Sequence, residues 1–291
     1  MNFPMTSKRQ LAVLCAIVLS LWWWLPDQLM GPYNSWNPHA LMEFVLTLFA
    51  ISFVSQWVIR QFGAHHGLLI MGLMGGFASS TATIHSMGSI AKAEPSLAGR
   101  AALSGVLSNV ATLIQLIILL NLLAPDLLAL VAIPIGFGLI GVLTYAVLVM
   151  PTQTANSFPV VNNSISVGID WKGMALLIFL VCTLSLVSAS LNSIYGQSGL
   201  WLGSVLSGLV DAHALVPSLA SLIRQDQLRL QDAATPLLIS LTANTLTKSL
   251  LAYQSGGLAY AKSVSIGIWV TTASVWLGYW QTLLPLSKLS A

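Results

Sequence analysis

The sequence predicts an all-α polytopic membrane protein of about 8–9 transmembrane helices in two related halves, with broken or re-entrant Gly/Ser-rich segments. Only 7% of the 291 residues are charged, against about 25% in an ordinary globular protein. Hydrophobic residues make up 56% of the chain and the mean hydropathy is +0.83. Because so few charged side chains cannot cover the surface of a soluble protein, the apolar exterior must face a lipid bilayer.

Nine segments approach the roughly 20 apolar residues that a crossing helix requires. A polar linker separates two groups of them, and the first segment follows Lys8 and Arg9 without a cleavage site, which predicts a retained anchor. The predicted regions are 1–38 (anchor span and loop), 39–150 (first membrane repeat), 151–171 (linker loop) and 172–291 (second membrane repeat). The nine segments are 10–26, 39–61, 66–91, 97–123, 126–150, 173–195, 199–223, 231–255 and 259–284.

The two groups of segments resemble each other in sequence. Residues 67–76 align with 199–208, and residues 79–86 align with 211–218. After a short gap, residues 108–112 align with 243–247. Each half therefore has a Gly-rich span with polar interruptions, followed by a span with a central Asn. Transporters built from duplicated halves place their binding site where the halves meet, near broken helices.

The distribution of Lys and Arg favours an irregular segment 66–91. If this segment dips into the membrane and returns, nine of these residues lie on the inside and only Lys262 lies outside. Gly75, Gly76 and the hydroxyl side chains that follow would permit such a break. The alternative, nine full crossings with the N-terminus outside, puts six inside and four outside.

Asp211 lies in the middle of segment 199–223, where an ionisable side chain is costly and by default marks a functional site. His213 would point away from it on a regular helix, but a break at Gly208 would bring both toward one cavity. Each residue also has a purely structural interpretation. Asp211 could serve only to hold helices together, and His213 could be a hydrogen-bonded histidine of the core.

Lys248 follows Asn244 by four residues, so both lie on one face of segment 231–255 and form a candidate partner surface for Asp211. The alternative for Lys248 is a side chain that reaches the membrane interface. In the first half the matched positions are uncharged, with Ser79 in place of Asp211 and Leu113 in place of Lys248. The candidate ligands there are Ser79, Ser80, Thr81 and Asn109. They could bind an anion through half-helix N-termini or a cation through oxygen atoms, or could serve packing alone.

Several functional classes lack their sequence features. The chain contains no HExxH, P-loop or GxSxG motif and no pair of carboxylates within one segment, so we expect no enzymatic activity and no cofactor. The net charge of +3 comes from scattered residues, which argues against a nucleic-acid partner. Cys15 and Cys182 lie in apolar runs and indicate neither a disulfide framework nor a CxxC site.

Residues 75–83 (GGFASSTAT), 207–212 (SGLVDA) and 243–248 (ANTLTK), in this order, resemble domain-of-unknown-function family 4010 (DUF4010). This is a membrane domain found C-terminal to MgtC/SapB domains in bacterial proteins, and the resemblance extends from about residue 22 to 284. It implies a multi-pass protein of the bacterial cytoplasmic (inner) membrane and no particular activity. In the family a second acid is common where this chain has His213, so a cation site formed by two acids would be weakened or retuned here.

The sequence therefore favours a transporter or channel-like protein for a small solute or ion, with its site at Asp211. A second hypothesis is a non-transporting membrane module that stabilises or regulates a partner protein, within a homo-oligomer or beside another membrane protein. A third and least favoured hypothesis is a membrane-embedded enzyme acting on a lipid-linked substrate.

Overall fold

The structure, a computed structural model, describes residues 20, 22–150 and 171–289. Regular secondary structure in these residues is helical apart from one isolated bridge between Met30 and Trp36, which confirms the all-α class. Of the predicted anchor span 10–26, the structure describes residues 20 and 22–26, and of the predicted linker 151–171 it describes Trp171 alone. The elements in order are η1 (Pro32–Asn34), α2 (Pro38–Ala93), η2 (Pro95–Leu97), α3 (Ala98–Leu123), α4 (Pro125–Val149), α5 (Trp171–Tyr195), α6 (Gln197–Val210), α7 (Val216–Arg224) and α8 (Leu230–Leu289).

Five stretches of the described chain are long and apolar enough to cross a membrane. They correspond to five of the predicted segments, which confirms a membrane protein with several candidate spans. Their bounds are Pro38–Ile59, Gly67–Ala93, Pro95–Leu123, Pro125–Val149 and Leu176–Tyr195. Length and composition alone do not show whether a stretch runs straight through the bundle or turns back within it. The path of the chain in the structure shows this.

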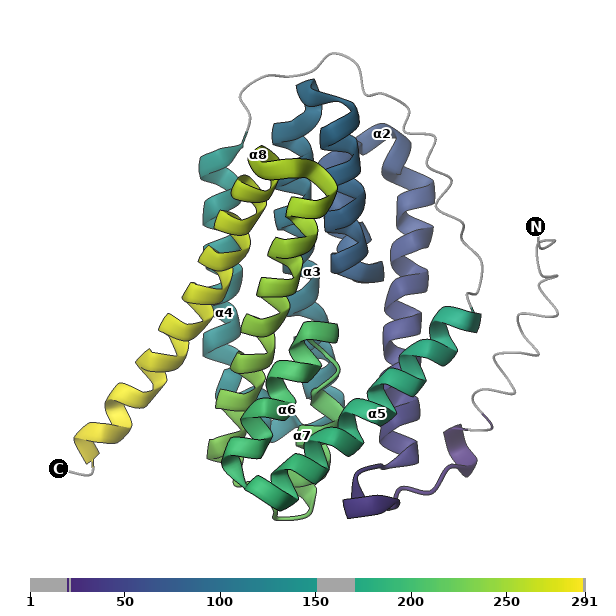
Figure 1. Cartoon of the computed structure of the whole chain (residues 1–291), viewed down its shortest axis with the longest axis vertical. Helices are drawn as coiled ribbons and strands as arrows, with labels where there is room; N and C mark the ends of the chain where they lie inside the picture. The colour runs from purple at the N-terminus through teal and green to yellow at the C-terminus, as the bar shows by residue number, and fades with distance from the viewer. Residues whose placement is uncertain (1–19, 21, 151–170, 290–291) are drawn as a thin grey trace.

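The bundle has two ends, which we name after the residues found there. At the Gly257 end, α8 reverses direction through Gly257, whose φ of 75° lies in the left-handed region that glycine adopts without strain. At the Leu123 end, α3 gives way to α4 and α8 begins. Figure 1 shows the Gly257 end at the top, with the two arms of α8 descending from it beside α3 and α4.

Helix α2 contains a helical hairpin. The chain turns at Gly67, runs inward, leaves helical geometry at Ser79 (φ −169°, ψ 111°) and then returns. A Cβ atom added to Gly75 would lie 2.7 Å from the Thr83 hydroxyl oxygen, whereas a straight helix separates residues eight apart by about 12 Å. Near the far end of the returning arm, Gly88 lies against Ser255 at the Gly257 end. We call Gly67–Ala93 hairpin 1 and Ser79 its tip; it is broken in segment 66–91, where a break was predicted.

Helices α6 and α7 form a second hairpin that enters from the opposite end. Helix α6 runs inward to Val210, the chain leaves helical geometry at Asp211 (φ −157°, ψ 141°), and α7 returns after a short turn. At the outer end of α7, the Gln225 amide donates to the Asn34 carbonyl (2.9 Å), just before the start of α2 at the Leu123 end. We call Gln197–Arg224 hairpin 2 and 211–215 its tip.

The second hairpin changes the path that the orientation counts assumed. Both counts took segment 199–223 as a crossing segment, whereas the chain turns back at Asp211. With two hairpins, four of the Lys and Arg positions in the described part of the chain lie toward the Gly257 end and three toward the Leu123 end. The first group is Arg60, Lys92, Arg100 and Lys262, and the second is Arg224, Arg229 and Lys288.

Glycine allows the inward arms of both hairpins to pack directly on neighbouring backbone. In hairpin 1, a Cβ atom on Gly76 would lie 2.6 Å from the Ser108 carbonyl oxygen of α3. In hairpin 2, a Cβ atom on Gly208 would collide with the Ser240 carbonyl of α8. Small residues of this kind let membrane helices approach closely. The hairpin tips are thereby held deep within the bundle, against α3 and α8.

Candidate functional site

Asp211 closes the turn at the tip of hairpin 2. Its carboxylate oxygen Oδ1 accepts hydrogen bonds from the His213 backbone N–H (2.7 Å) and from His213 Nδ1 (2.9 Å). The Asp211 side chain keeps 41% of its surface exposed, whereas the His213 side chain keeps 6%. One side of the carboxylate is therefore bonded within the tip and the other is open.

His213 joins the tip of hairpin 2 to α3. Its ring nitrogen Nε2 lies 3.1 Å from the backbone carbonyl oxygen of Thr112, a residue near the middle of α3. The ring thus bridges Asp211 on one side and α3 on the other. The break at Asp211 makes this bridge possible, because residues two apart on a continuous helix do not face each other.

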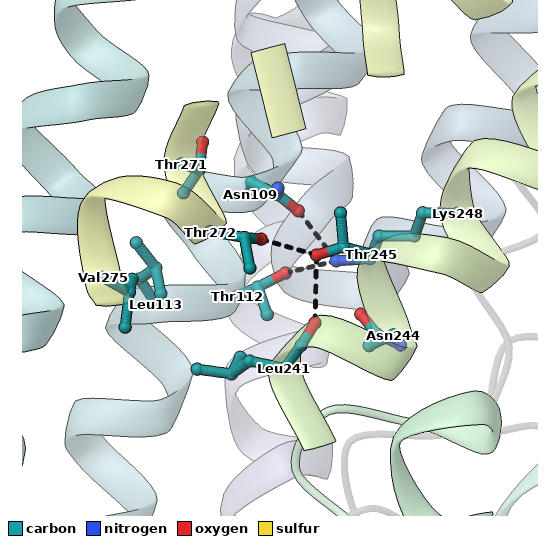
Figure 2. A pocket seen from close by; sticks show the side chains of 10 residues that line it. All are labelled: Asn109, Thr112, Leu113, Leu241, Asn244, Thr245, Lys248, Thr271, Thr272 and Val275. Atoms are coloured by element: carbon teal, nitrogen blue, oxygen red, sulfur yellow. Dashed lines mark hydrogen bonds between the residues drawn. The ribbon is translucent and has the colours of Figure 1, made fainter. Parts of the chain in front are cut away.

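Lys248 carries a buried amine beside the same residue of α3. The side chain is 2% exposed and extends from α8 toward α3 (Figure 2), where Nζ donates to Asn109 Oδ1 (2.8 Å) and to the Thr112 hydroxyl (3.2 Å). Among the described residues, no carboxylate oxygen lies within 4 Å of this amine. A buried ammonium group is costly unless it is hydrogen-bonded or faces a negative charge. Its direct hydrogen-bond partners here are neutral oxygens, and the Asp211 carboxylate acts on it from a longer distance.

Asn244 and Thr247 complete the broken end of α6. The Asn244 side-chain amide donates to the Gly208 carbonyl (3.2 Å), and the Thr247 hydroxyl donates to the Leu209 carbonyl (3.1 Å). These carbonyl groups lose their helical partners where α6 stops, and an unsatisfied carbonyl in a membrane interior is expensive. Helix α8 therefore supplies both the buried amine and the donors that stabilise the tip of hairpin 2.

A small cavity lined by both polar and apolar side chains lies between α3 and the two arms of α8. Its volume is about 20 Å³, enough for one water molecule or one small ion. Asn109, Asn244 and Lys248 line it together with several threonines (Figure 2), and the hydroxyls of Thr245 and Thr272 lie 2.7 Å apart across it. Amide and hydroxyl groups that face a cavity beside a buried amine are suited to binding a small polar guest.

The tip of hairpin 1 repeats the local geometry of hairpin 2 without charge. The Ser79 hydroxyl oxygen accepts the Ala82 backbone N–H (3.2 Å), as Asp211 accepts the His213 backbone N–H in hairpin 2. The Phe77 carbonyl, freed by the break, accepts the side-chain amide of Gln115 on α3 (3.0 Å). Ser79 is exposed, and Ser80 and Thr81 are half-buried. In the described part of the chain, neither Ser80 nor Thr81 makes a hydrogen bond to the residues around Lys248.

The two tips therefore dock on neighbouring positions of α3. Hairpin 2 contacts it at Thr112 and hairpin 1 at Gln115, three residues later and so within one helical turn. Five of the predicted site residues surround this region: Asp211, His213, Asn244, Lys248 and Asn109. Ser79 lies at the other tip, and Ser80 and Thr81 follow it on the returning arm of hairpin 1.

Sequence reasoning did not single out Thr112 or Gln115. Both follow Asn109 at helical spacing on one face of α3, a pattern that could have indicated a polar face. The contribution of Thr112 includes its backbone carbonyl, which no residue type encodes. In the described residues, no group of three or more His, Cys, Asp or Glu side chains is arranged to hold a metal ion.

Comparison with known proteins gives one match. The model of the family described as "Domain of unknown function (DUF4010)" matches residues 46–256, which include both hairpins and every predicted site residue. No curated protein and no solved structure matches the chain.

Proposed function

Because the chain belongs to the DUF4010 family, whose description gives no activity, we propose a function from the site: a bacterial cytoplasmic-membrane transporter or channel-like protein for a small solute or ion. The observation that carries the proposal is the meeting of two hairpins, which enter from opposite ends, on one turn of α3 beside buried charged residues. Broken helices whose ends meet near the middle of the bilayer are where transporters bind substrates and coupling ions.

The order of elements supports two halves of inverted orientation. The first half has the arm 38–66 of α2, hairpin 1, α3 and α4. The second half has α5, hairpin 2 and the two arms of α8. Hairpin 1 starts from the Gly257 end and hairpin 2 from the Leu123 end, as expected for repeats related by an axis in the membrane plane. The site then lies where the halves face each other, since Asn109 comes from one half and Lys248 from the other.

The proposed orientation follows from the Lys and Arg positions. More of these residues lie toward the Gly257 end than toward the Leu123 end, and cytoplasmic loops carry the excess of positive charge. In this orientation hairpin 1 opens from the cytoplasm and hairpin 2 from the opposite side. Each hairpin covers the site from one side, which is the arrangement that alternating access requires.

Charge and hydrogen bonding indicate how a guest would bind. Asp211 presents an exposed carboxylate edge, while Lys248 presents a buried amine with neutral partners. A guest with a negative group would complement Lys248, and a cation or a proton would complement Asp211. The hydroxyl-bearing tip of hairpin 1, at Ser79, adds oxygen ligands and the positive end of a half-helix.

A stability screen followed by a flux assay tests the proposal. The purified protein is heated with Na⁺, K⁺, Mg²⁺, chloride, sulfate and small carboxylic and amino acids, since a guest at a hundredfold excess over its Kd stabilises by about 2.7 kcal/mol. Compounds that raise the midpoint are then offered to vesicles containing the protein. We expect flux of at least one of them, lost in Asp211→Asn and kept in Asp126→Asn, a matched change of an exposed carboxylate at the start of α4.

Three outcomes would count against a transporter. Absence of stabilisation and flux across the whole panel would overturn it, and flux that survives Asp211→Asn would remove Asp211 from the site. Severe misfolding of Asp211→Asn, together with a stoichiometric co-purifying protein, would favour the non-transporting module instead.

A further inference from the structure

The ring of His213 lies between two hydrogen-bond acceptors. On one side Nδ1 is 2.9 Å from a carboxylate oxygen of Asp211, and on the other Nε2 is 3.1 Å from the Thr112 carbonyl oxygen. A backbone carbonyl can only accept, so Nε2 must carry a proton. A neutral imidazole has one N–H, and that proton is already used at Nε2.

The Nδ1 contact therefore needs a second proton. Two donors converge on Asp211 Oδ1, because the His213 backbone N–H also reaches it at 2.7 Å. An oxygen that accepts two hydrogen bonds and belongs to a partly exposed side chain fits an ionised carboxylate. The hydrogen-bond pattern is thus that of an imidazolium ring paired with a carboxylate, which together hold one proton more than a neutral ring and a carboxylate would.

We propose that the Asp211–His213 pair is a proton-binding site, and that its proton fastens the tip of hairpin 2 to α3. This inference rests on the proposed function, because it names the proton as the coupling ion of that site. When the proton leaves, a neutral ring can donate to Asp211 or to Thr112 but not to both. One of the two contacts then places a lone pair against an acceptor and is lost. Since the Asp211 contact is local, the contact between hairpin 2 and α3 is the one that opens.

The groups around the pair come from α8, α3 and hairpin 1. From α8, Lys248 is the charged side chain that acts on Asp211. From α3, the facing groups are Asn109 and Thr112, which are uncharged, and Ser79 at the tip of hairpin 1 is uncharged as well. The Asp211 side chain is 41% exposed, and ionisable side chains within membrane proteins almost always face the protein interior or water rather than lipid, so we take the proton to arrive through this exposed edge. Proton loss leaves a net negative pair and exposes the site from the Leu123 end.

Nitrogen-15 NMR of histidine-labelled protein in lipid nanodiscs tests the proton directly. The His213 resonances are identified by their absence in His213→Gln. We expect both ring nitrogens to be protonated at the acid end of the pH range in which the protein stays folded, and one of them to have lost its proton at the alkaline end. In Asp211→Asn the side-chain amide can donate to Nδ1, so we expect one neutral tautomer at every pH. A single neutral tautomer in the unsubstituted protein across this range would overturn the proposal.

Cysteine labelling tests the docking. Ala214, a buried residue of the tip, is changed to Cys in a background in which Cys15 and Cys182 are Ser, and the rate of thiol modification is measured against pH with and without Asp211→Asn. Both proteins carry the same thiol, so the ratio of their rates removes the pH dependence of the thiol itself. We expect the ratio to rise several-fold with pH, because only the protein with Asp211 undocks.

The outcomes separate this inference from the proposed function. A flat ratio with measurable transport would refute the proton site and leave the transporter proposal intact. A rising ratio with no transport of any tested compound would support the proton-controlled tip and refute the transporter.

Discussion

Replacing Gly76 with alanine should destabilise the protein by moving hairpin 1 away from α3. An added Cβ atom would lie 2.6 Å from the Ser108 carbonyl oxygen, 2.7 Å from Ser108 Cα and 2.9 Å from the Ala111 Cβ, whereas ordinary contacts lie at 3.4–4 Å. Two of these atoms belong to the backbone of α3 and cannot rotate aside. The arm must retreat, and overpacking of this kind costs about 1–3 kcal/mol.

Gly136 in α4 is the matched control, because a Cβ atom added there meets nothing within 4 Å. In a helix alanine is favoured over glycine by roughly 0.5–1 kcal/mol, so Gly136→Ala should leave stability unchanged or raise it. The free energy of unfolding can be followed by tryptophan fluorescence in mixed micelles, since the chain has 10 Trp residues. If Gly76→Ala unfolds at the same midpoint as Gly136→Ala, hairpin 1 does not pack on α3 as described.

Two further substitutions test the tips. Gln115→Leu removes the donor to the Phe77 carbonyl and should lower the free energy of unfolding by about 1–3 kcal/mol. The control Asn121→Leu, an exposed change on the same helix, should alter it by less than about 0.5 kcal/mol. Equal losses in the same unfolding assay would contradict the docking of hairpin 1. Lys248→Met removes the amine that contacts Asn109 and should abolish solute flux in vesicles. The control Lys262→Met changes an exposed lysine later in α8 and should keep the flux. Equal flux in both variants would exclude the Lys248 amine from the site.

The class and most of the helix positions follow directly from the sequence, but the reversal of hairpin 2 does not. Hydropathy reports the depth that a residue prefers and carries no information about direction, so a segment that enters and leaves by one side resembles one that crosses. Segment 66–91 could be recognised as broken because Gly75 and Gly76 precede a run of hydroxyls. For segment 199–223 the sequence predicts a break at Gly208 but not the reversal at Asp211, because the residues after the break are mostly apolar.

The charged part of the site was predictable for an energetic reason. Ionisable side chains in a membrane interior are rare and costly, so Asp211 and Lys248 are conspicuous in a chain with so few charges. Their partners are less conspicuous. Thr112 contributes a backbone carbonyl as well as a hydroxyl, and Gln115 acts on a carbonyl that exists only because hairpin 1 breaks two residues after Phe77. These contacts depend on the tertiary path of the chain, which local sequence does not determine.

The two tips differ in a way that separates structural need from function. Hairpin 1 caps its returning arm with a neutral Ser79 and satisfies its broken end with the amide of Gln115. Hairpin 2 solves the same problem with Asp211 and Asn244, and only there does a carboxylate appear. Since a hydroxyl suffices at the tip of hairpin 1, the carboxylate is more than the fold requires, and a charged group at this depth in a membrane protein costs free energy that the serine avoids. A role for Asp211 in binding a guest or carrying a proton would explain why hairpin 2 accepts a cost in stability that hairpin 1 avoids.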